Sequence, residues 1–137
     1  MNFGPGYDKQ EFWKNDELLT LGGEGMTCIF CQILAGELPG EILYEDEDLG
    51  VIKDINPKAP VHLLIIPKRH FDSVNSLDGE TFQIGGKMLL AAKKMAEARG
   101  IQSGYKILIN TGREVGQEIP HLHMHLLGGW GRKPFKR

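Results

Sequence analysis

The chain has 137 residues, of which 41% are hydrophobic and 25% charged, and its formal net charge is −2. This length suits one domain with one core, and the balanced charge argues against nucleic acid or a membrane surface as the main partner. No apolar run approaches the roughly 20 residues that a transmembrane helix needs, and no signal segment opens the chain. We therefore expect a cytoplasmic protein.

Residues 1–25 differ from the rest because glycine and proline interrupt them. Within them, residues 11–19 have the pattern of a short amphipathic helix and residues 21–25 that of a linker. We interpret residues 1–25 as an N-terminal extension and predict that the domain spans residues 26–137.

The domain is predicted to begin with one or two helical turns over residues 28–37, ended at Gly36. Three strands follow, at 41–46, 49–55 and 61–69, and the continuous apolar pattern of the third indicates burial on both faces. Asp78 and Thr81 are predicted to open a long helix that runs to about Arg99 and stops at Gly100.

That helix carries an apolar stripe at helical spacing, which we interpret as core: Phe82, Met88, Ala92, Met95 and Ala96. Two more strands are predicted at 105–110 and 121–127. This order indicates an α+β domain with an antiparallel sheet of about five strands, one long helix on one face and a short N-terminal helix.

The last predicted strand holds His121, His123 and His125 at alternate positions. In a strand this spacing places all three side chains on one face, about 7 Å apart per step, with the intervening apolar residues on the other. Three consecutive ligands on one strand fit a single metal ion poorly. The pattern therefore favours catalysis, with the central His123 as the reactive group and its neighbours holding or orienting a phosphate.

A polar loop, residues 110–120, leads into these histidines. Gly112 and Gly116 permit backbone amides to turn toward an anion, and Gln117 and Glu118 add polar side chains. We interpret the loop as part of a phosphate pocket.

The chain resembles the histidine-triad (HIT) family, whose motif is His-φ-His-φ-His-φ-φ with φ hydrophobic; "HLHMHLL" matches it at every position. The resemblance runs from residue 28 to residue 129 and includes "CIFCQILAGELP", "GYKILINTG" and "GQEIPHLHMHLLGG" in family order. It is strongest to the Hint branch, the nucleoside phosphoramidate hydrolases once called protein kinase C inhibitors. It implies the HIT-like fold, a two-fold homodimer and a purine nucleotide substrate related to AMP or GMP.

For the histidines, the resemblance implies that His123 attacks the α-phosphorus and forms a nucleotidyl-histidine, which water then hydrolyses. His125 would contact the phosphate, while His121 and His62 would support the ring and its tautomer. No metal or other cofactor is required for this chemistry in the family.

For the nucleotide, the resemblance implies that Asp54 binds the ribose hydroxyls. An apolar clamp around the purine would consist of Phe30, Ile33 and Ile55. The polar positions around the phosphate would be Asn110, Gln117 and Glu118, the last acting mainly through its backbone amide.

The two cysteines, Cys28 and Cys31, lie one helical turn apart and can face one ion. Some family members complete such a zinc site with two histidines, which here correspond to His70 and His121. Two interpretations therefore stay open: a structural zinc site, and a pair of packed, reduced thiols.

Two further functions compete with phosphoramidate hydrolysis. One is a dinucleoside polyphosphate hydrolase or nucleotidyl transferase of the same superfamily. The other is a non-catalytic adaptor that binds zinc and nucleotide, which would have no need of a nucleophile at His123.

Overall fold

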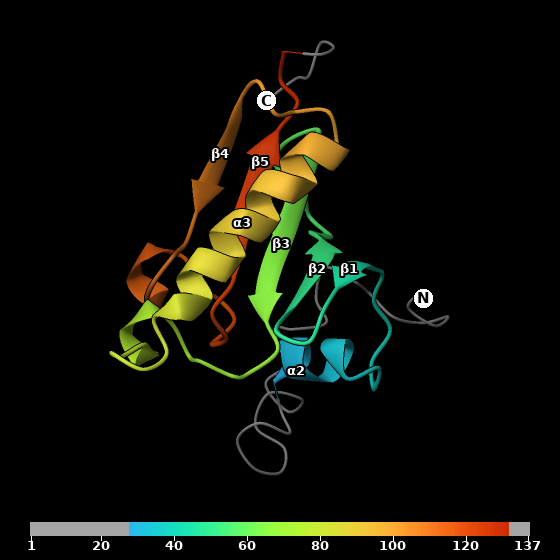
Figure 1. Ribbon diagram of the computed structural model, residues 1–137. Coiled ribbons are helices and arrows are strands. Elements are labelled where there is room, and N and C mark those ends of the chain that lie inside the picture. The colour runs from blue at the N-terminus through green and yellow to red at the C-terminus, as the bar shows by residue number, and fades with distance from the viewer. Residues whose placement is uncertain (1–27, 132–137) are drawn as a thin grey trace.

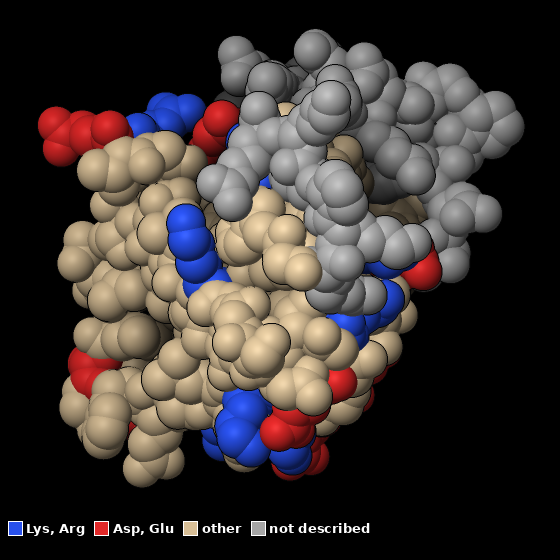
Figure 2. Space-filling model, turned by 90° about the horizontal axis from the view of Figure 1, so that it is seen from above, with Lys and Arg blue, Asp and Glu red and all other residues tan. Residues whose placement is uncertain are grey.

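The structure is a computed structural model, and it describes residues 28–131. The predicted extension, with its helix at 11–19, lies outside these residues. Within the described part of the chain, no helix is both long enough and apolar enough to cross a membrane. On the face seen in Figure 2, acidic and basic side chains are scattered and intermixed, and no continuous basic stripe is visible.

The described residues form an α+β fold, as predicted (Figure 1). The helices are α2 (Ile29–Leu34) and α3 (Gln83–Ala98), with short 3-10 turns η3 (Val74–Ser76) and η4 (Arg113–Val115). The strands are β1 (Ile42–Glu45), β2 (Leu49–Lys53), β3 (Val61–Pro67), β4 (Tyr105–Leu108) and β5 (Met124–Gly128). They form one five-stranded sheet in the order β1-β2-β3-β5-β4, and every neighbouring pair is antiparallel.

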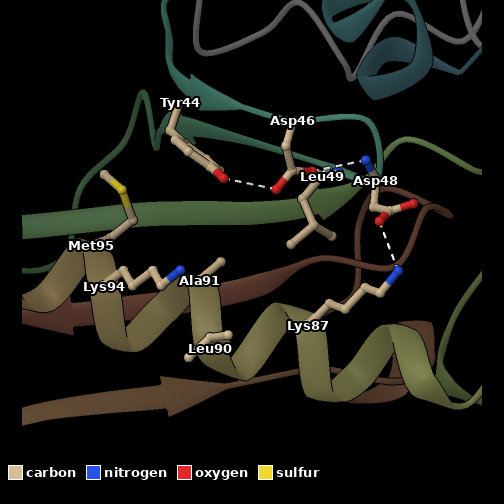
Figure 3. Close-up of a pocket in the computed structure, with 9 residues that line it drawn as sticks. All are labelled: Tyr44, Asp46, Asp48, Leu49, Lys87, Leu90, Ala91, Lys94 and Met95. Atoms are coloured by element: carbon tan, nitrogen blue, oxygen red, sulfur yellow. Dashed lines mark hydrogen bonds and ion pairs between the residues drawn. The ribbon is translucent and has the colours of Figure 1, made fainter.

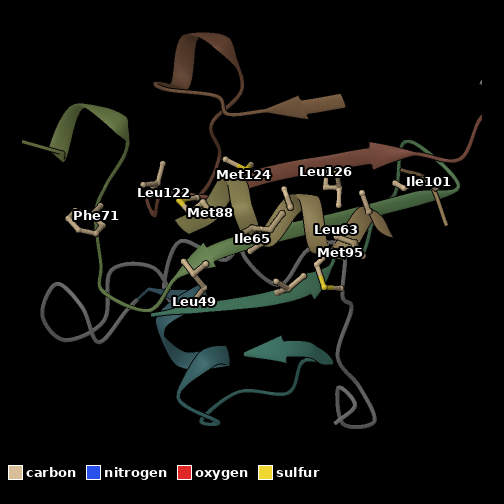
Figure 4. Close-up of a cluster of buried hydrophobic side chains, with 14 residues drawn as sticks. Leu49, Leu63, Ile65, Phe71, Met88, Met95, Ile101, Leu122, Met124 and Leu126 are labelled. Carbon is tan, nitrogen blue, oxygen red and sulfur yellow. The ribbon is translucent and has the colours of Figure 1, made fainter. Parts of the chain in front are cut away.

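The two faces of the sheet bury different sets of side chains. Helix α3 lies across one face, where Leu63 and Ile65 of β3 meet Met88 and other residues of the helix (Figures 1 and 4). On the other face, Leu64 and Ile66 pack in a second cluster that includes α2. Strand β3 is therefore buried on both faces, as its apolar continuity predicted.

Glycines end both helices where the sequence predicted it. Gly36 follows α2 with φ +80° and Gly100 follows α3 with φ +73°, a backbone region that favours glycine over residues with a Cβ.

The predicted start of the long helix is wrong, because α3 begins only at Gln83. The carboxylate of Asp78 accepts hydrogen bonds from the N–H groups of Glu80 and Thr81, which makes a separate turn before the helix. Between this turn and α3, backbone N–H groups bond to the carbonyl three residues earlier, as in a 3-10 helix; an example is Ile84 N–H to Thr81 O at 3.1 Å. Phe82 lies in this turn and is 59% exposed, so its assignment to the core is also wrong.

The last strand is shorter than predicted, because β5 starts at Met124 and not at residue 121. The N–H of Leu122 donates instead to the carbonyl of Phe71 at 2.7 Å, outside the sheet. The alternation of side chains nevertheless continues through this segment: Leu122, Met124 and Leu126 are all buried in the core against α3 (Figure 4). Of the three triad histidines, only His125 belongs to the strand.

The contrast between Met88 and Phe82 tests this packing. Met88 is fully buried, so Met88→Ala should lower the free energy of unfolding by about 2–5 kcal/mol through lost burial and a residual cavity. Phe82→Ala should change it by no more than about 0.5 kcal/mol, as is usual for surface positions. Urea denaturation followed by circular dichroism measures both, and equal losses would contradict the placement of Phe82.

Candidate active site

His123 is held as a neutral ring with one free nitrogen. The side chain is buried, and its Nδ1 lies 2.7 Å from the backbone carbonyl oxygen of His121. Because a carbonyl only accepts, Nδ1 carries the ring proton and Nε2 keeps its lone pair. Burial lowers the pKa of His123, which also favours the neutral form. A neutral imidazole with a free Nε2 is equipped to act as a nucleophile.

His62 and His125 form a hydrogen-bonded chain beside it. The backbone N–H of Lys58 donates to His62 Nδ1 at 3.0 Å, so the proton of His62 resides on Nε2. His62 Nε2 lies 2.9 Å from His125 Nδ1 and donates to it. The proton of His125 is therefore on its Nε2, the nitrogen that this chain leaves free to donate.

Both rings of this chain are uncharged near neutral pH. Burial, reinforced by the neighbouring His123 and His62, lowers the pKa of His125 to about 4. Burial also lowers the pKa of His62, and the nearby Asp54 carboxylate opposes that shift. The ring centroids of His123 and His125 are 5.1 Å apart, so a group reacting at His123 comes within reach of a neutral donor.

Asp54 follows β2 and lies next to this chain. Its Oδ1 accepts the N–H of Asn56 at 2.8 Å, and its Oδ2 lies 3.3 Å from His62 Nε2. The sequence predicted a ribose contact for this residue. The structure shows in addition that the carboxylate contacts the histidines, while its remaining lone pairs can still accept hydroxyl groups.

The three residues predicted to clamp the purine do not form one accessible surface. Phe30 of α2 packs edge-on against His121 and His123, with ring centroids 5.8 and 5.2 Å apart. Phe30 and Ile33 are buried in the second core cluster, at 4% and 5% exposure, and of the three only Ile55 is half-exposed. Phe30 thus supports the histidines directly.

The polar loop contains its expected glycines but uses Gln117 differently. Gly112 and Gly116 have φ of +100° and +105°, values that favour glycine. Asn110 is half-buried and Glu118 is exposed. The side chain of Gln117, in contrast, is buried and hydrogen-bonded to three backbone groups of the protein.

Four predicted metal ligands converge at the other end of the triad. One donor atom from each of Cys28, Cys31, His70 and His121 lies within 4.8 Å of all the others. His121 Nδ1 is 3.1 Å from Cys28 Sγ and 3.5 Å from Cys31 Sγ, and His70 Nδ1 is 3.4 Å from Cys31 Sγ. Tetrahedral zinc bonds of about 2.0–2.3 Å would place ligand atoms roughly 3.3–3.8 Å apart, so the spacing is close to that of a zinc centre.

The hydrogen bonds made by His70 and His121 also fit a bound metal ion. His121 Nε2 donates to the carbonyl of Pro67 and His70 Nε2 to the carboxylate of Asp72, each at 2.8 Å. In the neutral form of both rings, the two Nδ1 atoms are thus the unprotonated ones, and they face one another at 3.1 Å. Thiols are only weak donors, whereas a cation between the two lone pairs removes their repulsion. Bonds of this kind from a ligand's second nitrogen are typical around metal-bound histidines.

Asp72 and the backbone of Lys58 are site residues that the sequence reasoning missed. A carboxylate two residues after a candidate histidine ligand was the available signal for Asp72, since such ligands usually donate to a carboxylate or carbonyl. The contact of a backbone N–H with His62 has no signal in the side-chain pattern.

A groove of about 140 Å³ lies apart from these histidines, between α3 and the β1–β2 hairpin (Figure 3). Its apolar wall includes Leu49, Ala91 and Met95, which belong to the core on the α3 face of the sheet. Asp48 and Lys87 form an ion pair of 2.8 Å at its rim. The sheet separates the groove from the histidines, so we do not assign it to the site.

Comparison with known proteins finds a family match and several close relatives. Residues 27–135 match the family model described as "Scavenger mRNA decapping enzyme C-term binding". The chain is 50% identical to Protein HitA of Neisseria gonorrhoeae over 74% of this chain and 94% of that protein. It is 45% identical to a purine nucleoside phosphoramidase of Escherichia coli, over 74% of this chain and 86% of that protein.

A solved structure shows the same likeness. A HIT family hydrolase from Clostridium thermocellum superposes with a TM-score of 0.74 at 48% identity, covering 80% of this chain and 96% of that one. From the sequence match, these relatives and the shared fold, the chain belongs to the histidine-triad family.

Proposed function

We propose that this protein is a purine nucleoside phosphoramidate hydrolase of the Hint branch, which acts at the α-phosphorus through a covalent intermediate on His123. The observation that carries the proposal is the bond from His123 Nδ1 to the His121 carbonyl, which leaves Nε2 as a free nucleophile. The 45% identity to a purine nucleoside phosphoramidase supports the choice of substrate.

In the first step, the lone pair of His123 Nε2 forms a bond to phosphorus while the phosphorus–nitrogen bond of the substrate breaks. The amine leaves with the bonding electrons and takes up a proton from the solvent. The ring becomes positively charged, and the His121 carbonyl stabilises the charge through Nδ1–H. His125, with its proton on Nε2, donates a hydrogen bond to a phosphoryl oxygen, where negative charge develops.

In the second step, water attacks the phosphorus and loses a proton to the solvent. The bond from phosphorus to His123 Nε2 breaks and its electrons return to Nε2, which restores the neutral ring and releases the nucleoside monophosphate. His62 keeps His125 in the donating tautomer through both steps because its own Nδ1 is occupied by the backbone N–H of Lys58. Asp54 lies beside His62, where it can also accept the ribose hydroxyls.

We further propose that Cys28, Cys31, His70 and His121 hold a structural zinc ion, because their donor atoms fit a four-ligand site. Bound there, zinc would join the start of α2 to the segment that carries the triad. Four protein ligands leave no open position for water, so this proposal gives the metal no part in the reaction.

The edge of the sheet supports a homodimer. Strand β4 pairs only with β5 within the described residues, and Ile107 and Leu108 on it are 38% and 48% exposed. An antiparallel pairing of two such edges is self-complementary about a two-fold axis. We propose that β4 of two copies meet in this way.

Replacing the nucleophile tests the mechanism. His123→Ala should lower turnover of an adenosine phosphoramidate by several orders of magnitude, while AMP binding by calorimetry largely survives, because other nucleotide contacts remain. Brief incubation of the wild type should trap a nucleotidyl adduct by mass spectrometry. A variant with wild-type rates would rule out the covalent route, and faster cleavage of a dinucleoside polyphosphate than of the phosphoramidate would favour the alternative substrate class.

The zinc proposal predicts about one zinc per chain by metal analysis, when the protein is prepared without chelators. The double variant Cys28→Ser, Cys31→Ser should lose the metal and unfold at a lower temperature, because metal binding contributes to folding. Asp72→Ala should weaken zinc binding by about 10–100-fold without abolishing it. Metal-free wild-type protein with unchanged melting temperature and activity would instead identify the thiols as packing residues.

The dimer can be tested at the β4 edge. Light scattering should report about twice the chain mass of 15.3 kDa at micromolar concentration. Ile107→Lys with Leu108→Lys should shift the protein toward the monomer, because charges at a sheet edge oppose pairing. Tyr44→Lys is the control, since Tyr44 is 43% exposed on β1, the strand at the opposite edge of the sheet. A monomeric wild type would rule the proposal out.

A further inference from the structure

The buried amide of Gln117 closes the polar loop on itself. Its Oε1 accepts the N–H of Gly112 at 2.8 Å, and its Nε2 donates to the carbonyl of Ile119 at 3.1 Å. The backbone N–H of Gln117 also donates to the carbonyl of Gly112 at 3.1 Å. One side chain therefore ties Gly112, near the start of the loop, to Ile119, near its end.

The same amide anchors the loop to a second segment. Gln117 Nε2 donates to the carbonyl of Asp72 at 2.6 Å, and the carboxylate of Asp72 accepts a bond from His70. The carbonyl of Ile119 is shared, because it also accepts the N–H of His121 at 2.8 Å. Gln117 thus fixes the carbonyl of Ile119, two residues before the first histidine of the triad.

Besides this amide, backbone bonds of η4 shape the loop, such as Gly116 N–H to Arg113 O at 3.1 Å. These bonds lie within the loop, whereas the amide of Gln117 also joins it to Asp72. Residues 112–116 are exposed, and two glycines with positive φ give the backbone wide freedom in the unbound state. Both polar atoms of the Gln117 side chain are engaged, and the residue is only 6% exposed. Contact with a phosphate would require this side chain to abandon buried partners and leave them unsatisfied.

We infer that Gln117 is a positioning residue: its amide holds residues 112–119 in one conformation before substrate binds, so that backbone N–H groups of the loop meet the phosphate. Its function is not to contact the phosphate itself. The part of this inference that concerns phosphate rests on the proposed function, whereas the part that concerns the loop rests on hydrogen bonds alone.

Two substitutions separate the bonds of this amide. Gln117→Leu removes all three side-chain bonds. Gln117→Glu keeps the size and the acceptor for Gly112, but it cannot donate to the carbonyls of Asp72 and Ile119. Glu114→Gln, an exposed position on η4 in the same loop, changes the charge and leaves the bonds of Gln117 intact.

The first measurement is amide hydrogen exchange of the full-length protein without nucleotide. Both Gln117 variants should speed exchange across residues 112–119 by tenfold or more, while the amides of β2 and β3 keep their wild-type protection. Glu114→Gln should exchange as the wild type does. Should Gln117→Leu fail to fold, the isosteric Gln117→Glu carries the test.

The second measurement is calorimetric binding of AMP, with kinetics on the phosphoramidate. We expect both Gln117 variants to bind AMP at least tenfold more weakly and to lose kcat/KM in parallel. Weaker binding with unchanged loop exchange would make Gln117 a direct ligand and overturn the inference. Faster exchange throughout the sheet would overturn it as well, because the role would then be general stability. A wild type that binds AMP but does not hydrolyse the phosphoramidate would contradict the proposed function, while exchange and AMP binding would still test Gln117.

Discussion

The hydrogen bond between His123 Nδ1 and the carbonyl of His121 is the interaction on which the site depends. In a central strand of a sheet, the carbonyl of His121 would be bonded to a neighbouring strand. Strand β5 has neighbours on both sides, but its ladders stop at Met124 toward β3 and at His125 toward β4. The carbonyl of His121 is available to the ring two residues later because the chain leaves the ladder before that point.

The two faces of the sheet have different roles: one buries the main apolar core, and the other carries the histidines of the site. On the α3 face, the buried cluster consists of apolar side chains such as Leu63, Ile65 and Met88. On the opposite face, His62 and His125 project from neighbouring strands, and Phe30 of α2 supports His123 at its edge. Burial on this second face keeps the imidazoles neutral, which nucleophilic attack and neutral hydrogen-bond donation both require.

The two histidine clusters use the same residue type in different ways. Between His62 and His125, one ring carries a proton toward the other, so their approach to 2.9 Å is an ordinary hydrogen bond. Between His70 and His121, each Nε2 is bonded to an oxygen atom, so the Nδ1 atoms of the two neutral rings face each other at 3.1 Å. The first arrangement is complete in itself and suits proton-dependent chemistry. The second brings two histidine nitrogens together with two cysteine sulfur atoms, a donor set that fits a metal ion, which is why we propose a metal for one cluster and not for the other.

Local patterns in the sequence were sufficient to predict which helices and strands form and the direction in which many side chains point. The alternation at Leu122, Met124 and Leu126 correctly predicted one buried face, the apolar run of β3 predicted burial on both faces, and Gly36 and Gly100 predicted two helix ends. These features depend on backbone periodicity and on the conformational freedom of glycine, which act over a few neighbouring residues.

Hydrogen-bond partners were decided only by the tertiary structure. His62 and His125 are separated by 63 residues along the chain, and Gln117 reaches a carbonyl 45 residues away. The early end of the β5 ladder also depends on a segment from elsewhere in the chain, because the N–H of Leu122 donates to the carbonyl of Phe71. A periodic pattern specifies which way a side chain points, but the atom that it meets is supplied by whichever distant segment the fold brings there, and that atom determines where each imidazole carries its proton.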